Sequence, residues 1–285
     1  MMAAMPVLAI NSHVAHGYVG NGAAVFALRR LGIEAWPLYT VALSNHPGYA
    51  SFRGRATDTA HLDDMVAGLV EVGVMAQCRG VVSGYLGDSA HGGVVRRALG
   101  AARSATPDAP YVLDPVMGDT GPGLYVPRSI AETMRDDLLP AADVVTPNAF
   151  ELGWLTGRDV VDVASATAAA HAVRARGPHT VVVTSLPVDD ATLGVLGVTG
   201  DGVWLVRVPR FTFPVPPNGA GDLLTGLLAA HVVRGTALPS ALAQSANAVH
   251  AVLAATQAAG RRELDLVGAQ HALAAPPETL TTETP

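Results

Sequence analysis

This chain of 285 residues contains no lysine, and the 18 residues counted as lysine or arginine are all arginine. A phosphate-binding loop of the Walker type needs a lysine beside the phosphates, so this route to nucleotide binding is excluded. An enzyme that binds an aldehyde cofactor as a lysine imine is excluded as well. Any chemistry must therefore depend on carboxylates, backbone amides, arginine, histidine or a metal ion.

Cysteine and charge are also scarce. Cys78 is the only cysteine, so no disulfide can form within the chain, which fits a reducing cytoplasm. Charged residues make up 15% of the chain and the formal net charge is -6. This balance, without an arginine-rich stripe, argues against a nucleic-acid partner. No apolar run approaches the about 18 residues that span a membrane, so no membrane association is expected.

Hydrophobic residues are plentiful, at 49%, and they follow an alternating pattern. Short apolar runs predict strands at residues 7–10, 35–40, 80–83, 111–113, 143–146, 180–184, 193–198 and 203–208. Longer amphipathic stretches predict helices at residues 21–31, 61–72, 89–105, 149–156, 164–176, 219–234 and 240–259. This alternation predicts an α/β fold of three layers, α/β/α, around a mostly parallel central sheet. We expect a single domain over 1–285, with a loose tail from about residue 275.

The segment Pro216-Pro217-Asn218-Gly219-Ala220-Gly221-Asp222 precedes a long apolar helix. Small residues leave the backbone bare, so a bulky anion can approach the unpaired amides at the start of the helix. The helix dipole adds partial positive charge there. A carboxylate beside such a site could take the proton from an alcohol that attacks phosphorus. The structural alternative is that Asp222 is an ordinary residue of a helix start.

This segment resembles the Gly-x-Gly-Asp signature of the ribokinase-like superfamily. The resemblance implies that Asp222 is the catalytic base. It also implies that the amides of Gly219, Ala220 and Gly221 form an anion hole for the transferred phosphoryl group.

Further segments resemble the pyridoxal kinases of that superfamily, in the same order along the chain. They are Asn11-Ser12-His13-Val14, Gly17-Tyr18-Val19-Gly20-Asn21, Trp36-Pro37-Leu38, Leu43-Ser44-Asn45-His46, Ser83-Gly84-Tyr85-Leu86-Gly87, Asp114-Pro115-Val116-Met117-Gly118, Thr146-Pro147-Asn148 with Glu151, and Val183-Thr184-Ser185. The resemblance extends from about residue 7 to about residue 259. It implies ATP-dependent phosphorylation of the 5′-hydroxymethyl group of pyridoxal, in vitamin B6 salvage.

The resemblance also implies roles for individual residues. The substrate pocket would contain Asp222, Ser12, Val19, Val41, His46, Pro47, Tyr85 and, on a mobile Gly-Pro lid at 118–125, Tyr125. The ATP site would contain Asp114, Thr146, Glu151, Thr184, Ser185, Arg207, Val208, Pro209, Arg210, Asn218, Gly219 and Gly221. Asp114 and Glu151 would hold Mg²⁺, Glu151 through water. A monovalent cation such as K⁺ and a homodimer are further implications.

One departure from the family pattern concerns the substrate loop. Pro47 stands where these kinases usually carry threonine, so one hydroxyl contact to the substrate is missing.

Three alternative functions stay open. The first is a hydroxymethylpyrimidine kinase, which shares the fold, the anion hole and the base. A non-catalytic vitamin-binding or sensor protein is the second, and the intact Asp222 segment disfavours it. The third is a sugar or nucleoside kinase, which usually carries a β lid after its first strand. Residues 43–55 are short and irregular for such a lid.

Overall fold

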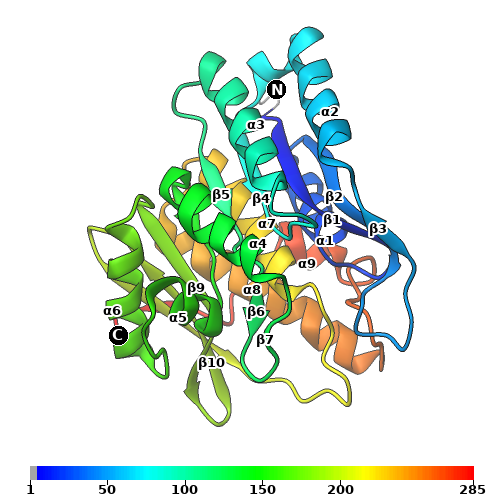
Figure 1. Ribbon diagram of the computed structural model, residues 1–285. Helices are drawn as coiled ribbons and strands as arrows, with labels where there is room; N and C mark the ends of the chain where they lie inside the picture. The colour runs from blue at the N-terminus through cyan, green and yellow to red at the C-terminus, as the bar shows by residue number, and fades with distance from the viewer. Residues whose placement is uncertain (1–4) are drawn as a thin grey trace.

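A ten-stranded sheet with helices on both faces dominates the computed structural model, which describes residues 5–285 (Figure 1). The inner strands run parallel and are, in spatial order, β2 (Ala35–Asn45), β1 (Val7–His16), β4 (Gly80–Ser83), β5 (Tyr111–Leu113), β8 (Val144–Val145) and β9 (Thr180–Asp189). The edges are antiparallel: β3 (Gly54–Ala56) pairs with β2, whereas β9 is followed by β10 (Thr192–Val198), β11 (Val203–Pro209) and β12 (Thr282–Glu283). A separate hairpin joins β6 (Gly118–Asp119) to β7 (Gly123–Leu124).

The helices form the two outer layers, as Figure 1 shows. One face of the sheet is covered by α2 (Thr59–Glu71), α3 (His91–Ala105), α4 (Arg128–Thr133), α5 (Ala149–Thr156) and α6 (Val163–Arg174). The other face is covered by α1 (Asn21–Arg30), α7 (Ala220–Val233), α8 (Leu238–Ala258) and the short α9 (Gln270–Ala274). Three short helical turns among residues 5–285 complete the first layer, at Val74–Gln77, Met134–Leu138 and Leu139–Ala141.

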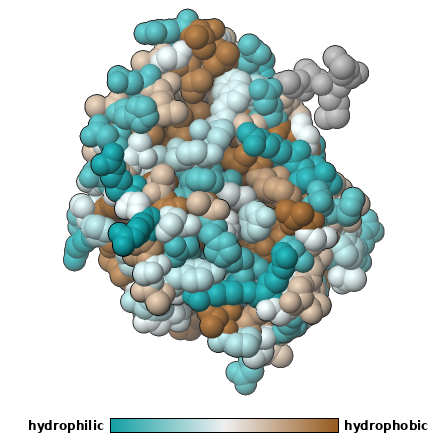
Figure 2. All heavy atoms as spheres, turned by 90° about the vertical axis from the view of Figure 1, so that its right-hand side faces the viewer, coloured by the Kyte–Doolittle hydropathy of each residue, from teal (hydrophilic) through white to brown (hydrophobic). Residues whose placement is uncertain are grey.

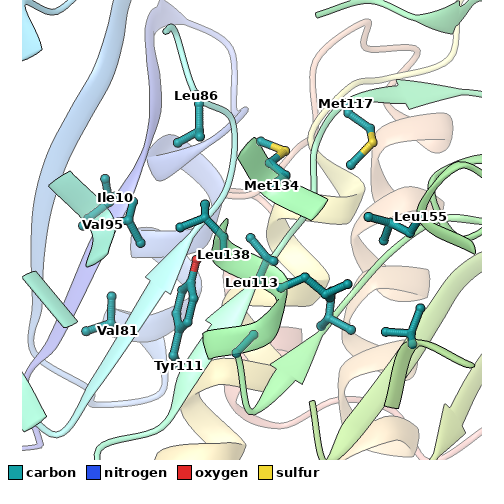
Figure 3. Packing of buried hydrophobic residues seen from close by; sticks show 14 of the residues in the cluster. Ile10, Val81, Leu86, Val95, Tyr111, Leu113, Met117, Met134, Leu138 and Leu155 are labelled. Atoms are coloured by element: carbon teal, nitrogen blue, oxygen red, sulfur yellow. The ribbon is translucent and has the colours of Figure 1, made fainter. Parts of the chain in front are cut away.

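Burial on both faces of the strands explains these layers. In β1, Leu8 and Ile10 belong to the core beneath α2–α6, whereas Val7 and Ala9 belong to the core beneath α1 and α7. Successive side chains of a strand point to opposite faces, so a continuous apolar run requires cover on both. Figure 3 shows the first core, in which Tyr111 packs near residues of the flanking helices. The predicted three-layer α/β/α fold with a mostly parallel sheet is confirmed.

Strands β1 and β2 extend further than their apolar runs predicted. The predictions ended at residues 10 and 40, but the pairing of β1 with β2 continues to His16 and Asn45. β3 then pairs with β2 over Val41–Leu43, so a small three-stranded flap projects past the carboxyl end of the sheet. The flap carries polar, partly exposed residues, so hydrophobicity did not mark it. A register shift between Asn11 and His13 interrupts the pairing, as bulges often do beside functional sites.

The end of the chain differs from the expectation of a loose tail from about residue 275. Thr282 and Glu283 pair with Val206 and Leu205 of β11. The buried Asn247 of α8 binds the preceding segment, because its Oδ1 accepts the N–H of Leu280 at 2.9 Å. The composition of the tail did not reveal these partners, which are distant in sequence.

Hydrophobic and polar residues intermingle on the side of the molecule shown in Figure 2. No helix within residues 5–285 is both long and apolar enough to cross a bilayer. A surface hollow of about 610 Å³ lies between β2 and α2, and its lining includes Trp36, Leu38 and Met65. None of the predicted site residues lines this hollow.

Candidate active site

The predicted site residues gather where the parallel strands end. The segments after β1, β4, β5, β8 and β9 lie together at the carboxyl ends of the strands, because these strands run in the same direction. The start of α7, which is distant from β1 in the sequence, lies at the same end of the sheet. Two hydrogen bonds join them: Asn11 Nδ2 donates to Asp222 Oδ1 at 3.0 Å, and Thr225 Oγ1 donates to Asp114 Oδ2 at 3.0 Å.

Glycine is required at the turn before α7. Gly219 is the N-cap of α7 and has φ +96°, a region that L side chains rarely adopt. A Cβ atom there would collide with the backbone carbonyl of Tyr18, so the turn lies directly against the loop between β1 and α1. No side chain caps the helix start. The first amides of α7 therefore have no acceptor within the helix, and amides of this kind can bind an anion.

Asp222 lies in the first turn of α7, beside these amides. Its carboxylate accepts hydrogen bonds from Asn11 and from the backbone N–H of Gly20. Burial raises the pKa of Asp222, and the two hydrogen bonds partly oppose that rise. The side chain is only partly buried, so the carboxylate combines a dry surrounding with access from the surface.

Asp114 follows β5 and is buried. Its pKa lies well above the usual range, because of burial first and then the charges of Glu151 and Asp222. Thr225 donates to Oδ2, and Thr225 and Thr146 share a further hydrogen bond of 2.9 Å between their hydroxyls. Asp114 Oδ1 accepts no hydrogen bond from any residue between 5 and 285, so this oxygen is available to a ligand.

Glu151 lies in the first turn of α5 and forms a capping box with Asn148. Its two oxygens accept the N–H groups of Met117 at 3.0 Å and Asn148 at 2.9 Å. Burial raises the pKa of Glu151 to about 8. Both oxygens already have protein donors, which agrees with contact to a cation through water rather than directly.

These carboxylates suit a hard cation, which prefers oxygen ligands. Buried carboxyl groups with raised pKa values repel one another when ionised, and a divalent ion between them would relieve that repulsion. The described chain contains no ready cluster of three or more His, Cys, Asp or Glu residues arranged around one point. Asp114 would therefore supply one direct ligand, and phosphate oxygens and water would supply the others.

Tyr125 comes directly after the β6–β7 hairpin. The Gly-Pro segment predicted as a lid forms the β6–β7 hairpin, and the N–H of Tyr125 donates to the carbonyl of Met117 at 3.1 Å. Tyr125 is 52% exposed. Its pKa is raised by desolvation first and then by the charges of Glu151, Asp114 and Asp222.

The segment after β9 contains a strained residue. Ser185 has φ +50° and is the one non-glycine residue with positive φ among residues 5–285. Such a conformation costs about 1 kcal/mol or more and often accompanies a functional site. The neighbouring Thr184 is buried and donates its N–H to the carbonyl of Pro147 at 2.9 Å. Thr184 and Ser185 therefore lie next to the segment after β8.

The predicted ring pocket combines four buried or half-buried residues around the flap. Val19 and Val41 are buried, and Ser12 lies directly against Gly20. The N–H of Tyr85 donates to Asn11 Oδ1 at 2.8 Å. Pocket residues and Asp222 are thus connected through the single side chain of Asn11.

The loop that carries His46 and Pro47 is held by a group of contacts that we call the Tyr49 clamp, comprising Tyr49, Arg262 and Glu263. The Tyr49 hydroxyl donates to Glu263 Oε1 at 2.6 Å, and the Arg262 guanidinium lies 3.6 Å from the centre of the Tyr49 ring. His46 is half-buried, and burial lowers its pKa; the charge of Glu263 partly opposes this effect, and the charge of Arg262 adds to it. Pro47 is exposed.

The loop of His46 and Pro47 also lies beside the turn before α7. Arg262 donates to the carbonyl of Gly48 at 2.7 Å, and a Cβ on Gly48 would lie 3.9 Å from Asn218 Nδ2. Asn218 therefore lies between the loop of His46 and Pro47 and the start of α7.

The segment 207–210 lies at the periphery of the group. Residue pairing places Arg207 level with Gly194 of β10 and Leu186 of β9, just beyond Ser185. Its side chain forms a 2.7 Å ion pair with Glu283 of the tail. Within residues 5–285, no hydrogen bond joins Arg207, Val208, Pro209 or Arg210 to the Asp222 group. The predicted contact of this segment with adenine stays a prediction.

Sequence reasoning did not assign roles to four residues that organise the site, namely Asn11, Asn148, Thr225 and Tyr49. Thr225 follows Asp222 by three residues, a spacing that puts both on one side of a helix, so this signal was readable. Tyr49 gave no such signal, because its partners are more than 200 residues away in the sequence.

Comparison with known proteins adds independent findings. The family model described as "Phosphomethylpyrimidine kinase" matches residues 59–266. The pyridoxal kinase PdxY of Rubrobacter xylanophilus is 46% identical over 275 residues, covering 95% of this chain and 94% of that protein. The PdxY of Leifsonia xyli is 41% identical over 277 residues, covering 96% and 97%.

Two solved structures are similar over almost the full length. Pyridoxal kinase from Leishmania donovani, in complex with ADP and ginkgotoxin, has a TM-score of 0.90 and 31% identity, covering 98% of this chain and 99% of that one. A putative phosphomethylpyrimidine kinase from Bacteroides thetaiotaomicron has a TM-score of 0.90 and 27% identity, covering 99% and 98%. These similarities confirm the ribokinase-like fold.

Proposed function

The chain belongs to the pyridoxal kinase family, and we propose that it transfers the γ-phosphoryl group of ATP to the 5′-hydroxymethyl group of pyridoxal. The product is pyridoxal 5′-phosphate. The observation that carries this proposal is the position of Asp222, a partly buried carboxylate beside the uncapped amides of α7.

Each part of the site has a role in this reaction. The amides of Gly219, Ala220 and Gly221 bind the transferred phosphoryl group, and Asp222 accepts the proton of the attacking hydroxyl. Because phosphoryl transfer is mostly positioning and charge neutralisation, these fixed groups supply most of the acceleration. Proton removal by Asp222 adds about 10²–10⁴-fold.

The remaining residues bind the two substrates. Val19 and Val41 pack on the ring of the vitamin, and Ser12, His46 and Tyr85 contact its edges. Thr146, Thr184, Ser185 and the segment 207–210 contact ATP. Tyr125 closes over the reacting groups and excludes water, which would otherwise accept the phosphoryl group.

Mg²⁺, held by Asp114 and through water by Glu151, would neutralise charge on the ATP phosphates. The buried carboxylates described above fit this ion. We also propose K⁺ as an activating monovalent cation, by family resemblance.

We propose further that the chain is one cytoplasmic kinase domain that forms a homodimer. The similarity of curated pyridoxal kinases over 94% or more of their own length supports a single domain. Size-exclusion chromatography with light scattering tests the dimer.

A second candidate function is phosphorylation of hydroxymethylpyrimidine. The description of the matching family model and the exposed Pro47 favour it. The two substrates share the hydroxymethyl group, so the anion site does not discriminate between them.

One assay separates the two candidates. Purified protein is incubated with ATP, Mg²⁺ and, in turn, pyridoxal, pyridoxine, pyridoxamine or hydroxymethylpyrimidine, and the phosphorylated product is measured. We expect the largest kcat/KM with pyridoxal, and a larger value with hydroxymethylpyrimidine contradicts the proposal.

The variant Asp222→Asn tests the base in the same assay. We expect kcat to fall by at least about 10²-fold while ATP binding, measured by calorimetry, is retained. Unchanged turnover would remove Asp222 from this role.

A further inference from the structure

Asn11 is buried, with 5% of its surface exposed, and its side chain makes three hydrogen bonds at the centre of the site. Its Oδ1 accepts the N–H of Ser12 at 2.7 Å and the N–H of Tyr85 at 2.8 Å. Its Nδ2 donates to Asp222 Oδ1 at 3.0 Å. The same side chain therefore contacts β1, the segment after β4 and the start of α7.

The orientation of this amide is fixed by its partners. Two backbone N–H groups can only donate, so the atom that faces them must be the oxygen of Asn11. The NH₂ group then has to face Asp222. That oxygen of Asp222 is held as an acceptor, and the N–H of Gly20 gives the carboxylate a second donor. A proton from the substrate is therefore directed to the part of the carboxylate that Asn11 leaves free.

The surrounding backbone leaves this side chain no alternative position. A Cβ on Gly84 would collide with the amide of Asn11, so the backbone after β4 packs directly against it. On the other side, the register shift of β1 follows Asn11 immediately. The close packing of the Gly84 backbone limits the movement of the amide.

We propose that Asn11 is a positioning residue that fixes the distance and orientation between the Asp222 carboxylate and the wall of the vitamin pocket formed by Ser12 and Tyr85. This inference rests on the proposed kinase function. Asn11 touches neither the phosphoryl group nor the attacking oxygen, and it acts through Asp222.

The sharpest test is Asn11→Asp, which has nearly the same shape. An aspartate keeps the oxygen that accepts from Ser12 and Tyr85 and replaces only the NH₂ donor that faces Asp222. The two carboxylates then repel, or they share one proton that can lie on either group, so Asp222 loses the permanent donor that the amide supplies. Because a hydrogen bond to a charged group is among the stronger ones, we expect kcat to fall about 10–100-fold.

Substrate binding separates positioning from a general structural defect. KM for ATP and the dissociation constant for pyridoxal, measured by calorimetry, should stay within threefold of the wild-type values. The proposal is overturned if kcat also stays within threefold. It is equally overturned if pyridoxal binding weakens as much as kcat falls, since Asn11 would then build the pocket rather than orient the base.

A second measurement does not depend on turnover. A double-mutant cycle combines Asn11→Ser with Asp222→Ala, and urea unfolding gives the stability of each variant. We expect the two changes to be coupled by at least about fivefold in the unfolding equilibrium constant. Additive effects overturn the contact, and the cycle also serves if Asn11→Asp does not fold.

The cycle also distinguishes this inference from the proposed function. If the wild-type protein phosphorylated neither pyridoxal nor hydroxymethylpyrimidine, the kinase proposal would fail, whereas the coupling between Asn11 and Asp222 would still be measured.

Discussion

Replacement of Gly219 by alanine tests whether the turn before α7 is as tightly constrained as its geometry indicates. Gly219 has φ +96°, and an added Cβ would collide with the carbonyl of Tyr18 and lie 3.3 Å from the Cα of Val19. Both neighbours are backbone atoms, which cannot move aside as the end of a flexible side chain can. The turn must therefore shift away from the β1–α1 loop.

The expected loss of folding free energy in Gly219→Ala has two parts. A left-handed conformation costs an L residue about 1–2 kcal/mol, and a steric conflict in packed structure adds about 1–3 kcal/mol. The sum, about 2–5 kcal/mol, is large against a typical total of about 5–15 kcal/mol, but it leaves a folded protein. For a chain of this size the melting temperature should fall by roughly 5–10 °C.

Activity should fall further than stability suggests. A displacement of about 1 Å of positioned groups can cost about 10²-fold in rate, so we expect Gly219→Ala to lower kcat/KM by at least that factor. Steady-state kinetics with ATP and pyridoxal and thermal unfolding measure the two effects on the same preparation.

Gly235 provides a matched control. It also has a positive φ, +67°, but a Cβ there would meet nothing within 4 Å. Gly235→Ala should therefore cost only the conformational strain, about 1–2 kcal/mol, and keep its activity. If Gly219→Ala were as stable and as active as Gly235→Ala, the close approach of the turn to Tyr18 would not constrain the site.

Three further predictions concern the surroundings of the site. Burial raises the pKa of Glu151 to about 8 from its ordinary value of 4.5, so the folded state retains the Glu151 proton in this range. Without Mg²⁺, the free energy of unfolding should therefore decrease from about pH 4.5 to pH 8, by up to about 1.4 kcal/mol per pH unit, in urea titrations. Tyr49→Phe removes the hydrogen bond to Glu263 and should raise KM for pyridoxal about 3–10-fold without changing KM for ATP. Thr225→Val removes the donor to Asp114 and should lower kcat about tenfold in the same assay.

Each of these predictions has a control. Glu151→Gln should reduce the decrease with pH and leave the part that comes from the raised pKa values of Asp114 and Asp222, and an unchanged slope would assign the whole decrease to those groups. Tyr39→Phe should leave KM unchanged, because the Tyr39 hydroxyl has no partner within residues 5–285. Thr167→Val should leave kcat unchanged, because this hydroxyl bonds only to the carbonyl of Val163 in its own helix. Equal effects of a variant and its control would contradict the assigned contact.

The sequence predicted the central part of the fold well because local pattern and burial agree there. The runs at residues 80–83 and 111–113 and the helix at residues 149–156 match β4, β5 and α5 to the residue. These strands are buried on both faces, so their positions are apolar apart from Ser83, and the ends are clear. The flap at His13–His16 and Leu43–Asn45 has no such signature, since it mixes polar residues with apolar ones such as Val14, and its residues pair mostly with one another.

The candidate site divides in the same way. Asp222 and Asp114 were predicted because each follows a strong local signal, a glycine-rich helix start or the end of a buried strand. The hydrogen bonds that orient them come from Asn11 and Thr225, and the first of these spans 211 positions. Such partners depend on how β1 and α7 pack, which local composition does not encode.

The strand β12 also covers the edge strand β11 and so hinders association between copies of this chain. It pairs with Leu205 and Val206, whose backbone groups would otherwise face solvent at the border of the sheet. An unpaired border of this kind is a template for association between chains. A purification tag fused after residue 285, or a deletion of the last few residues, would disturb this cover. Poor solubility of such a preparation would then reflect the bared border rather than a fault in the kinase site.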